Sequence, residues 1–184
     1  MTQSARMSLS ALSSIRIVLV GTPHPGNIGA TARAMKTMGL TQLCLVSPAR
    51  FPDWEATAMA AGADDVLENA LLFDSLEEAL SGTVLQVAFS ARHRALSHLP
   101  LTVREAAAEA VSVAAAQPHQ LAQPVAPQSV ALVFGNETYG LSNEEVMCCG
   151  RLAGIPVDPS FSSLNLAAAV QIAAYELRLA ALAG

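Results

Sequence analysis

The sequence predicts an α/β domain with a mostly parallel sheet flanked by helices. Segments typical of strands alternate with segments typical of helices along the chain, which is the pattern of a parallel sheet with crossover helices. Several strand-like segments are almost continuously apolar, as strands buried on both faces are. The chain has 184 residues, of which 52% are hydrophobic and 14% charged. This length and composition fit one folded domain with its own core and exclude disorder for most of the chain.

The first strand and helix are the clearest elements. Residues 15–20 form an apolar run interrupted by one arginine, and glycines and prolines break the pattern directly after it. A helix is then expected to run to Met38, with Asn27 as its N-cap and Gly39 at its end.

The rest of the chain repeats this alternation. Further strands are expected at 41–46, 71–73, 84–89, 129–134 and 152–157. Further helices are expected at 53–61, 75–80, 102–116, from 142 onwards, and from Ser162 or Ser163 to Leu182. Three of these helices begin with Ser or Thr followed three residues later by Glu, the spacing of a capping box, at positions 75, 102 and 142.

The domain organisation is simple. One domain is expected from residue 15 to residue 184, after an N-terminal extension of residues 1–14 that lacks the continuous apolar core of a signal peptide. Residues 117–128 carry three prolines among glutamines and are expected to form a surface loop. No uninterrupted apolar run approaches the about 18 residues of a membrane helix. A cytoplasmic protein without a membrane span is therefore expected.

The charge and the cysteine content indicate which ligands, metals and disulfides can be expected. Ten basic and fifteen acidic residues give a net charge of −5, which disfavours nonspecific binding to a phosphate backbone. All of the cations but one are arginine, whose planar fork suits phosphate, although a general preference for arginine explains this equally well. The three cysteines are odd in number and show no C-x-x-C spacing. Neither a disulfide framework nor a metal site is expected from them.

Ligands of open parallel sheets bind beyond the carboxyl ends of the strands. The segments expected at these ends are 21–27, 89–92, 135–141 and 158–165. The first has the glycine spacing that opens a P-loop, but Asn27 and Ile28 stand where Lys and Ser or Thr are required. A dinucleotide fingerprint fails as well, because His24 occupies a glycine position. Both nucleotide sites are therefore rejected.

Three polar features remain at these ends. Arg33 lies about 140° around the first helix from Ile28, away from the sheet-facing side, so it is either a surface residue or a ligand contact. The glycines of residues 135–141 permit close approach of a ligand to the backbone, although a plain turn explains them almost as well. Two serines and an asparagine precede the last helix, and an N-cap accounts for only one of them.

Taken together and in this order, these features resemble the three motifs of the SPOUT superfamily of RNA methyltransferases. The motifs are NIGATARA at 27–34, FGNETYGL at 134–141, and the segment 155–166. More narrowly, RAMKTMGL at 33–40 and Ser-Ala-Arg at 90–92 resemble the TrmJ branch of the SpoU family, tRNA ribose 2′-O-methyltransferases of the anticodon loop. The resemblance covers residues 15–182.

The resemblance implies a deep trefoil knot near the C-terminus and S-adenosylmethionine as the methyl donor, bound largely by backbone groups. On the matching positions the expected cofactor contacts are Phe89, Ser90, Ala91, Gly135, Leu141, Ile155, Ser163, Leu164 and Asn165. The implied reaction is 2′-O-methylation of the cytidine or uridine at position 32 of tRNA.

Arg33 and Asn27 are the catalytic candidates that the resemblance implies. A guanidinium stays protonated and is a poor base, so Arg33 is expected to hold the phosphate beside the target ribose through two parallel hydrogen bonds. Asn27 is expected to cap its helix and to orient the substrate or Arg33.

The resemblance also implies a homodimer in which the arginine of one subunit faces the cofactor of the other. The last helix is a candidate interface because of its small residues Ala169, Ala173 and Ala180. Cations for tRNA are expected in one groove, contributed by Arg33, Lys36, Arg92 and Arg94. A C-terminal tRNA-binding extension of related enzymes is expected to be absent from this chain.

Two other classes of function remain open. One is a knotted RNA-binding or assembly module without catalytic activity, which would not bind S-adenosylmethionine. The other is a small-molecule enzyme that uses the loop at Gly135 and has no dependence on tRNA.

Overall fold

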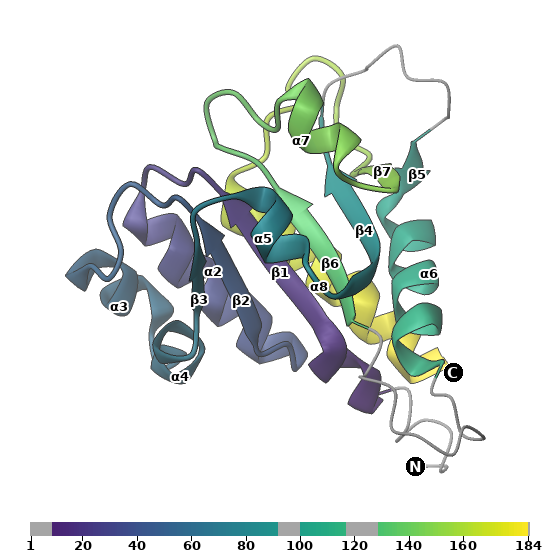
Figure 1. Cartoon of the computed structure of the whole chain (residues 1–184), viewed down its shortest axis with the longest axis horizontal. Helices are drawn as coiled ribbons and strands as arrows, with labels where there is room; N and C mark the ends of the chain where they lie inside the picture. The colour runs from purple at the N-terminus through teal and green to yellow at the C-terminus, as the bar shows by residue number, and fades with distance from the viewer. Residues whose placement is uncertain (1–8, 92–99, 117–128, 184) are drawn as a thin grey trace.

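The computed structural model describes residues 9–91, 100–116 and 129–183, and these form a three-layer α/β fold (Figure 1). Seven strands pair in the order β3-β2-β1-β6-β4-β7-β5, and every pairing is parallel. The α/β class and the parallel sheet are thereby confirmed. The strands are β1 (Ile15–Val20), β2 (Gln42–Val46), β3 (Leu71–Phe73), β4 (Thr83–Phe89), β5 (Leu101–Thr102), β6 (Ser129–Phe134) and β7 (Arg151–Gly154).

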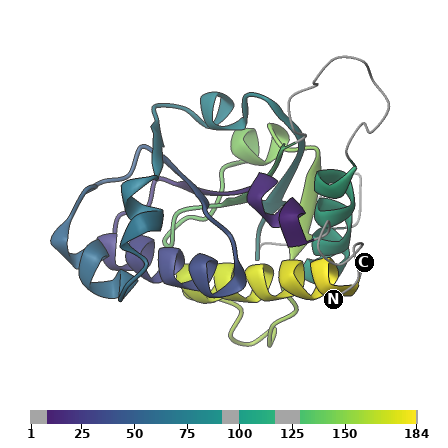
Figure 2. The ribbon, with the colours of Figure 1, turned by 90° about the horizontal axis from the view of Figure 1, so that it is seen from below.

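Helices cover both faces of the sheet, and Figure 2 separates the two layers. They are η1 (Leu12–Ser14), α2 (Pro25–Met38), α3 (Trp54–Ala60), α4 (Asp64–Glu68), α5 (Leu76–Leu80), α6 (Val103–Ala115), α7 (Asn143–Met147) and α8 (Leu166–Ala183). The larger core lies under α2, α6 and α8, and the smaller one under α5 and α7. Both faces of β6 are covered, and all six of its residues are buried, as its apolar run predicts.

Capping boxes start α6 and α7 as the spacing predicts. In each, the Ser or Thr accepts from the backbone of the Glu three residues on, whose carboxylate accepts from the capping residue's backbone. At α5 only half of the box forms. Ser75 accepts from the Glu78 backbone, but the Glu78 carboxylate accepts from the Asp74 N–H instead.

Two helix starts and one strand end differ from the sequence prediction. The helix α2 begins at Pro25, with His24 in the N-cap position, because proline at the first helical position needs no hydrogen-bond acceptor. Asn27 therefore lies in the first turn and is not the N-cap. The start of α8 is Leu166, since the side chain of Asn165, not of either serine, accepts from a first-turn N–H. The strand β7 ends at Gly154 because the chain reaches Pro156, which cannot donate to a sheet.

The sequence did not predict the shortest elements or the burial of a residue near the N-terminus. The two-residue β5 and the five-residue α4 were not anticipated. Leu12, in the expected extension, is buried in the larger core. The expected loop 117–128 and the cations Arg92 and Arg94 lie outside the described residues.

Within the residues that the structure describes, one helix meets the length and hydropathy expected of a membrane span. It is α8, whose 18 residues have a mean hydropathy of 1.4. Gln171, Glu176 and Arg178 interrupt the apolar residues of this helix. The sequence therefore shows no uninterrupted apolar run here. Seven of its side chains are buried, and it packs against α2 and α6, as core helices of folded domains do.

The contact between α2 and α3 depends on one glycine. A Cβ at Gly29 would lie 1.9 Å from the backbone oxygen of Ala56. The substitution Gly29→Ala is expected to cost about 3 kcal/mol and to lower Tm by roughly 6–12 °C, because the helices must separate. Thermal unfolding followed by circular dichroism measures this. The control is Gly150→Ala, where the nearest atom would be 3.8 Å away. A Tm for Gly29→Ala within 2 °C of the control would contradict this packing.

Candidate active site

A pocket of about 290 Å³ opens at the carboxyl ends of β4, β6 and β7. Parallel sheets place ligands at this edge. At its base the rings of Phe89 and Phe134 stack with centroids 4.7 Å apart. The wall combines apolar side chains, serine hydroxyls and loop backbone. Its residues are Phe89, Ser90, Ala91, Phe134, Gly135, Asn136, Glu137, Thr138, Tyr139, Gly140, Ile155, Val157, Ser162, Ser163, Leu164, Leu166 and Ala169.

Seven of the nine expected cofactor contacts line this pocket. They are Phe89, Ser90, Ala91, Gly135, Ile155, Ser163 and Leu164. The side chain of Leu141 instead packs into the smaller core on the other face of the sheet, with 1% of its surface exposed. Asn165 lies beside the pocket, at the start of α8, and is described below.

The loop after β6 is built around Asn136. Its Oδ1 accepts from the N–H groups of Thr138 (2.7 Å) and Tyr139 (3.2 Å), and its Nδ2 donates to the Gly21 carbonyl at 2.8 Å. The backbone of Gly140 closes the loop by donating to the Asn136 carbonyl at 2.7 Å. One side chain therefore shapes this loop and ties it to the end of β1.

A chain of amide hydrogen bonds joins three loops that are far apart in the sequence. Asn27 Nδ2 donates to Glu137 Oε1 at 2.5 Å, and Asn27 Oδ1 accepts from Asn165 Nδ2 at 3.0 Å. Both polar atoms of the Asn27 side chain are thus used. The first turn of α2, the loop after β6 and the start of α8 are held together at one point.

Two polar residues of the loop after β6 were not predicted from the sequence as site residues. Asn136 and Glu137 both line the pocket. The Oε2 atom of Glu137 is buried and has no hydrogen-bond partner among the described residues. It is therefore an acceptor available to a donor on a ligand, since buried polar atoms are normally paired. The signal for both was their place directly after the most apolar strand.

Arg33 is not part of the pocket. It is exposed on α2, six residues after Asn27, as its helical position predicts. Among the described residues, six of the seven cations donate to a carboxylate or a backbone carbonyl, and Arg33 does not. One copy of the chain thus leaves the expected arginine free in solvent and does not bring it to the pocket.

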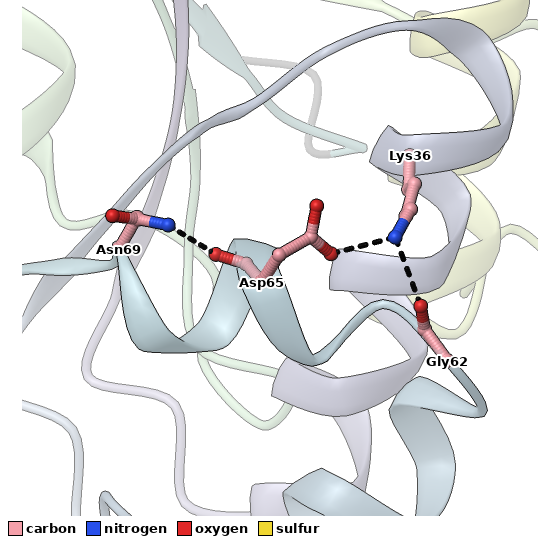
Figure 3. Close-up of polar contacts among 4 residues, drawn as sticks. All are labelled: Lys36, Gly62, Asp65 and Asn69. Carbon is pink, nitrogen blue, oxygen red and sulfur yellow. Dashed lines mark hydrogen bonds and ion pairs between the residues drawn. The ribbon is translucent and has the colours of Figure 1, made fainter.

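Lys36, which was expected beside Arg33 in a cationic groove, is engaged elsewhere. Its Nζ donates to Asp65 Oδ1 at 2.8 Å and to the Gly62 carbonyl at 3.0 Å (Figure 3). The hydrogen bond from Lys36 lowers the pKa of Asp65. This exposed pair links α2 to α4 and partly neutralises the lysine.

Desolvation by burial raises the pKa of all three thiols, Cys44, Cys148 and Cys149. Burial raises the pKa of Cys149 to about 12, so this thiol stays protonated and is a poor nucleophile. Within 9–91, 100–116 and 129–183, no group of three His, Cys, Asp or Glu side chains is arranged to hold a metal ion.

The comparison with protein families decides the class. The model of the SpoU rRNA Methylase family matches residues 14–175, which is most of the chain. The chain belongs to this family. A SpoU relative, the tRNA (cytidine/uridine-2′-O-)-methyltransferase TrmJ of Escherichia coli K12, is 52% identical over 172 residues, 94% of this chain and 65% of the relative. The chain spans about two thirds of the length of such curated relatives.

Solved structures of a probable methylase and of a TrmJ protein share the fold. A probable methylase family protein from Haemophilus influenzae Rd KW20 superposes with a TM-score of 0.83 at 46% identity, over 94% of this chain and 68% of that one. TrmJ from Z. mobilis ZM4 superposes with a TM-score of 0.78 at 35% identity, over 89% of this chain and 67% of that one.

Gly135 leaves room for the backbone of Gly140 and Leu141 at the wall of the pocket. A Cβ at this position would lie 2.3 Å from the backbone of Gly140 and of Leu141. We expect Gly135→Ala to push the loop away from β6 and to weaken binding of S-adenosylmethionine by on the order of 100-fold, because the backbone groups lose their positions. Isothermal titration calorimetry gives the Kd, and Gly150→Ala again provides the control. Unchanged affinity in the Gly135 variant would show that this wall does not contact the cofactor.

Proposed function

We propose that the chain is the catalytic domain of an S-adenosylmethionine-dependent tRNA 2′-O-methyltransferase. Its substrate is the cytidine or uridine at position 32 of the anticodon loop, and it acts in the cytoplasm. Membership of the SpoU family and the 52% identity to relatives named tRNA (cytidine/uridine-2′-O-)-methyltransferase support this. The observation that carries it is the Asn27 amide, which joins the pocket loops to the helix that bears Arg33.

The pocket suits the methyl donor. Ile155, Val157 and Leu164 offer an apolar surface for adenine, and the hydroxyls of Ser90 and Ser163 lie on the same wall. The Glu137 oxygen that lacks a partner provides an acceptor for a donor group of the ligand. When bound, S-adenosylmethionine supplies a methyl group on a sulfonium. The SpoU methyltransferase AviRb, which shares the fold at 23% identity and a TM-score of 0.69, is known in complex with AdoMet.

Arg33 acts on the RNA. Because it makes no ion pair among the described residues, its fork is free to hold a phosphate through two hydrogen bonds. Holding the phosphate fixes the adjacent ribose so that its 2′-oxygen can attack in line. The hydroxyl proton passes to that phosphate or to water, since a guanidinium cannot accept it.

The reaction needs two copies of the chain, because one copy leaves Arg33 outside its own pocket. We place the dimer contact on α8, but not on the small residues suggested by the sequence. Ala173 is fully buried in the core of its own chain, and Ala169 and Ala180 pack against that core. The exposed apolar side chains form a different stripe, Ala168, Tyr175, Leu179 and Leu182, at successive spacings of seven, four and three. Such spacing is typical of helix-to-helix contacts.

The route of the chain after β7 supports the knot. The strand β7 lies on the far side of β4 from β1. Asn165, eleven residues after the end of β7, nevertheless bonds to Asn27 at the start of α2. The chain therefore returns across the ends of β4 and β6, which a C-terminal knot requires.

Nucleoside mapping tests the proposed function. The purified chain is incubated with S-adenosylmethionine and unmodified tRNA, and the RNA is digested and analysed by mass spectrometry. We expect a 2′-O-methyl group on the nucleotide at position 32. Methylation confined to another nucleotide would refute the position. RNA binding without S-adenosylmethionine binding would favour the non-catalytic module, and cofactor turnover independent of tRNA would favour the small-molecule enzyme.

A further inference from the structure

Two aromatic side chains next to the pocket are turned to solvent. Tyr139, on the loop after β6, lines the pocket and is 71% exposed. Phe161, on the loop between β7 and α8, is 81% exposed and directly precedes the pocket residues Ser162 and Ser163. Both loops lie at the same end of the molecule in Figure 1. The chain has only eight aromatic residues, so two such rings beside one pocket need an explanation.

The backbones that carry these rings are fixed by hydrogen bonds. The Tyr139 N–H donates to Asn136 Oδ1 at 3.2 Å, within the loop that Asn136 ties to β1. The Phe161 N–H donates to the Asp158 carbonyl at 3.0 Å. Hydrogen bonds from the hydroxyl and N–H of Ser160 hold Asp158 and lower its pKa, so it stays ionised in this turn. The rings are thus presented on ordered turns.

We propose that Tyr139 and Phe161 are positioning residues that stack on unpaired nucleobases beside the target ribose. The proposal rests on the proposed function and names the feature of the RNA that is recognised. Aromatic side chains bind single-stranded RNA by stacking on splayed bases, which a duplex does not offer. The site would therefore select a nucleotide in a loop, whatever its neighbours in sequence.

The negative net charge of the chain favours a contribution from stacking. The chain carries a net charge of −5, and among the described residues only Arg33 is a cation without a protein partner. Phosphate contacts alone would give weak RNA binding, because their strength depends on the number of phosphates neutralised. Base stacking adds affinity that does not require more cations.

The experiment measures binding of a labelled anticodon stem-loop by fluorescence anisotropy. Tyr139→Ala and Phe161→Ala are each expected to raise Kd on the order of 10-fold. Tyr139→Phe and Phe161→Tyr keep a ring and are expected to bind as the wild type does. Trp54→Ala is the matched control, since Trp54 is 79% exposed but does not line the pocket. A duplex RNA of the same composition is expected to bind equally to all variants.

Steady-state kinetics and cofactor binding complete the test. For Phe161→Ala we expect KM for tRNA to rise while kcat at saturating tRNA and the Kd for S-adenosylmethionine stay within twofold. For Tyr139→Ala, whose side chain lines the pocket, we expect KM for tRNA to rise by a larger factor than the Kd for S-adenosylmethionine. Stem-loop affinities within twofold of the wild type would overturn the proposal, and so would a loss confined to cofactor binding, which would make Tyr139 a cover for adenine. If the wild type binds the stem-loop but methylates no RNA, the proposed function fails and the binding result still decides the stacking.

Discussion

Replacing Arg33 with alanine is expected to lower kcat for tRNA methylation by on the order of 100-fold or more, because the target ribose is no longer fixed for in-line attack. Folding should be unaffected, since the side chain is exposed and bonded to no described residue. Tm within 2 °C of the wild type and an unchanged Kd for S-adenosylmethionine would show this. Single-turnover methylation with saturating tRNA measures the loss.

Two further variants separate the fork of Arg33 from its charge. Arg33→Lys keeps the charge but cannot make two parallel hydrogen bonds, so turnover should remain strongly reduced. Arg50→Ala removes another exposed arginine, one that pairs with Asp53 and Glu55, and should leave turnover within twofold. Near-normal turnover of Arg33→Lys would refute the bidentate role.

Asn27→Asp is expected to have the second largest effect. In the wild type, Asn27 Nδ2 donates a hydrogen bond to Glu137 Oε1 at 2.5 Å. The substitution replaces this donor by an oxygen, so that two carboxylates face each other. The loop after β6 loses its link to α2, whereas the new carboxylate can still accept from Asn165 Nδ2. We expect a loss of about 1–3 kcal/mol in the free energy of unfolding and a large drop in kcat. Chemical denaturation and single-turnover kinetics measure the two effects.

The loss of stability in Asn27→Asp is expected to depend on pH. Two adjacent carboxylates retain one proton at pH values where an isolated carboxyl is ionised. The penalty is therefore present at high pH and relieved as pH falls, so the stability difference from the wild type should shrink towards pH 5. Asn27→Ala adds no charge and should lack this dependence. In the double variant Asn27→Asp with Glu137→Gln, donor and acceptor exchange places, and stability should recover. Failure of this exchange to restore stability would contradict the hydrogen-bonded link.

Much of the fold could be predicted because single segments determine it. The apolar run of β6 and the capping spacings of α6 and α7 each specify a local structure without reference to the rest of the chain. The first turn of α2 could not be assigned in this way. Asn27 is a good capping residue by type, but Pro25 starts the helix earlier, and the amide instead bonds to two residues more than 100 positions away. Contacts of that range leave no local pattern.

The site residues also divide into those that local sequence predicts and those that depend on long-range contacts. The residues that end β4 and β6 were predicted to meet because parallel strands end at one edge, and Ser90 and Gly135 do line one pocket. The side chain of Leu141 points into the other core, since its orientation depends on how the loop returns over the sheet. Arg33 does not line the pocket of its own chain, so its proposed role depends on the proposed dimer.

The central claim is that the loops at the ends of β4, β6 and β7 form one pocket for S-adenosylmethionine. Isothermal titration of the purified chain with S-adenosylmethionine tests it most directly. The account predicts saturable binding with one molecule per chain, and strong weakening by Gly135→Ala but not by Gly150→Ala. Absence of binding to a folded wild-type chain, or equal affinity in both glycine variants, would contradict it.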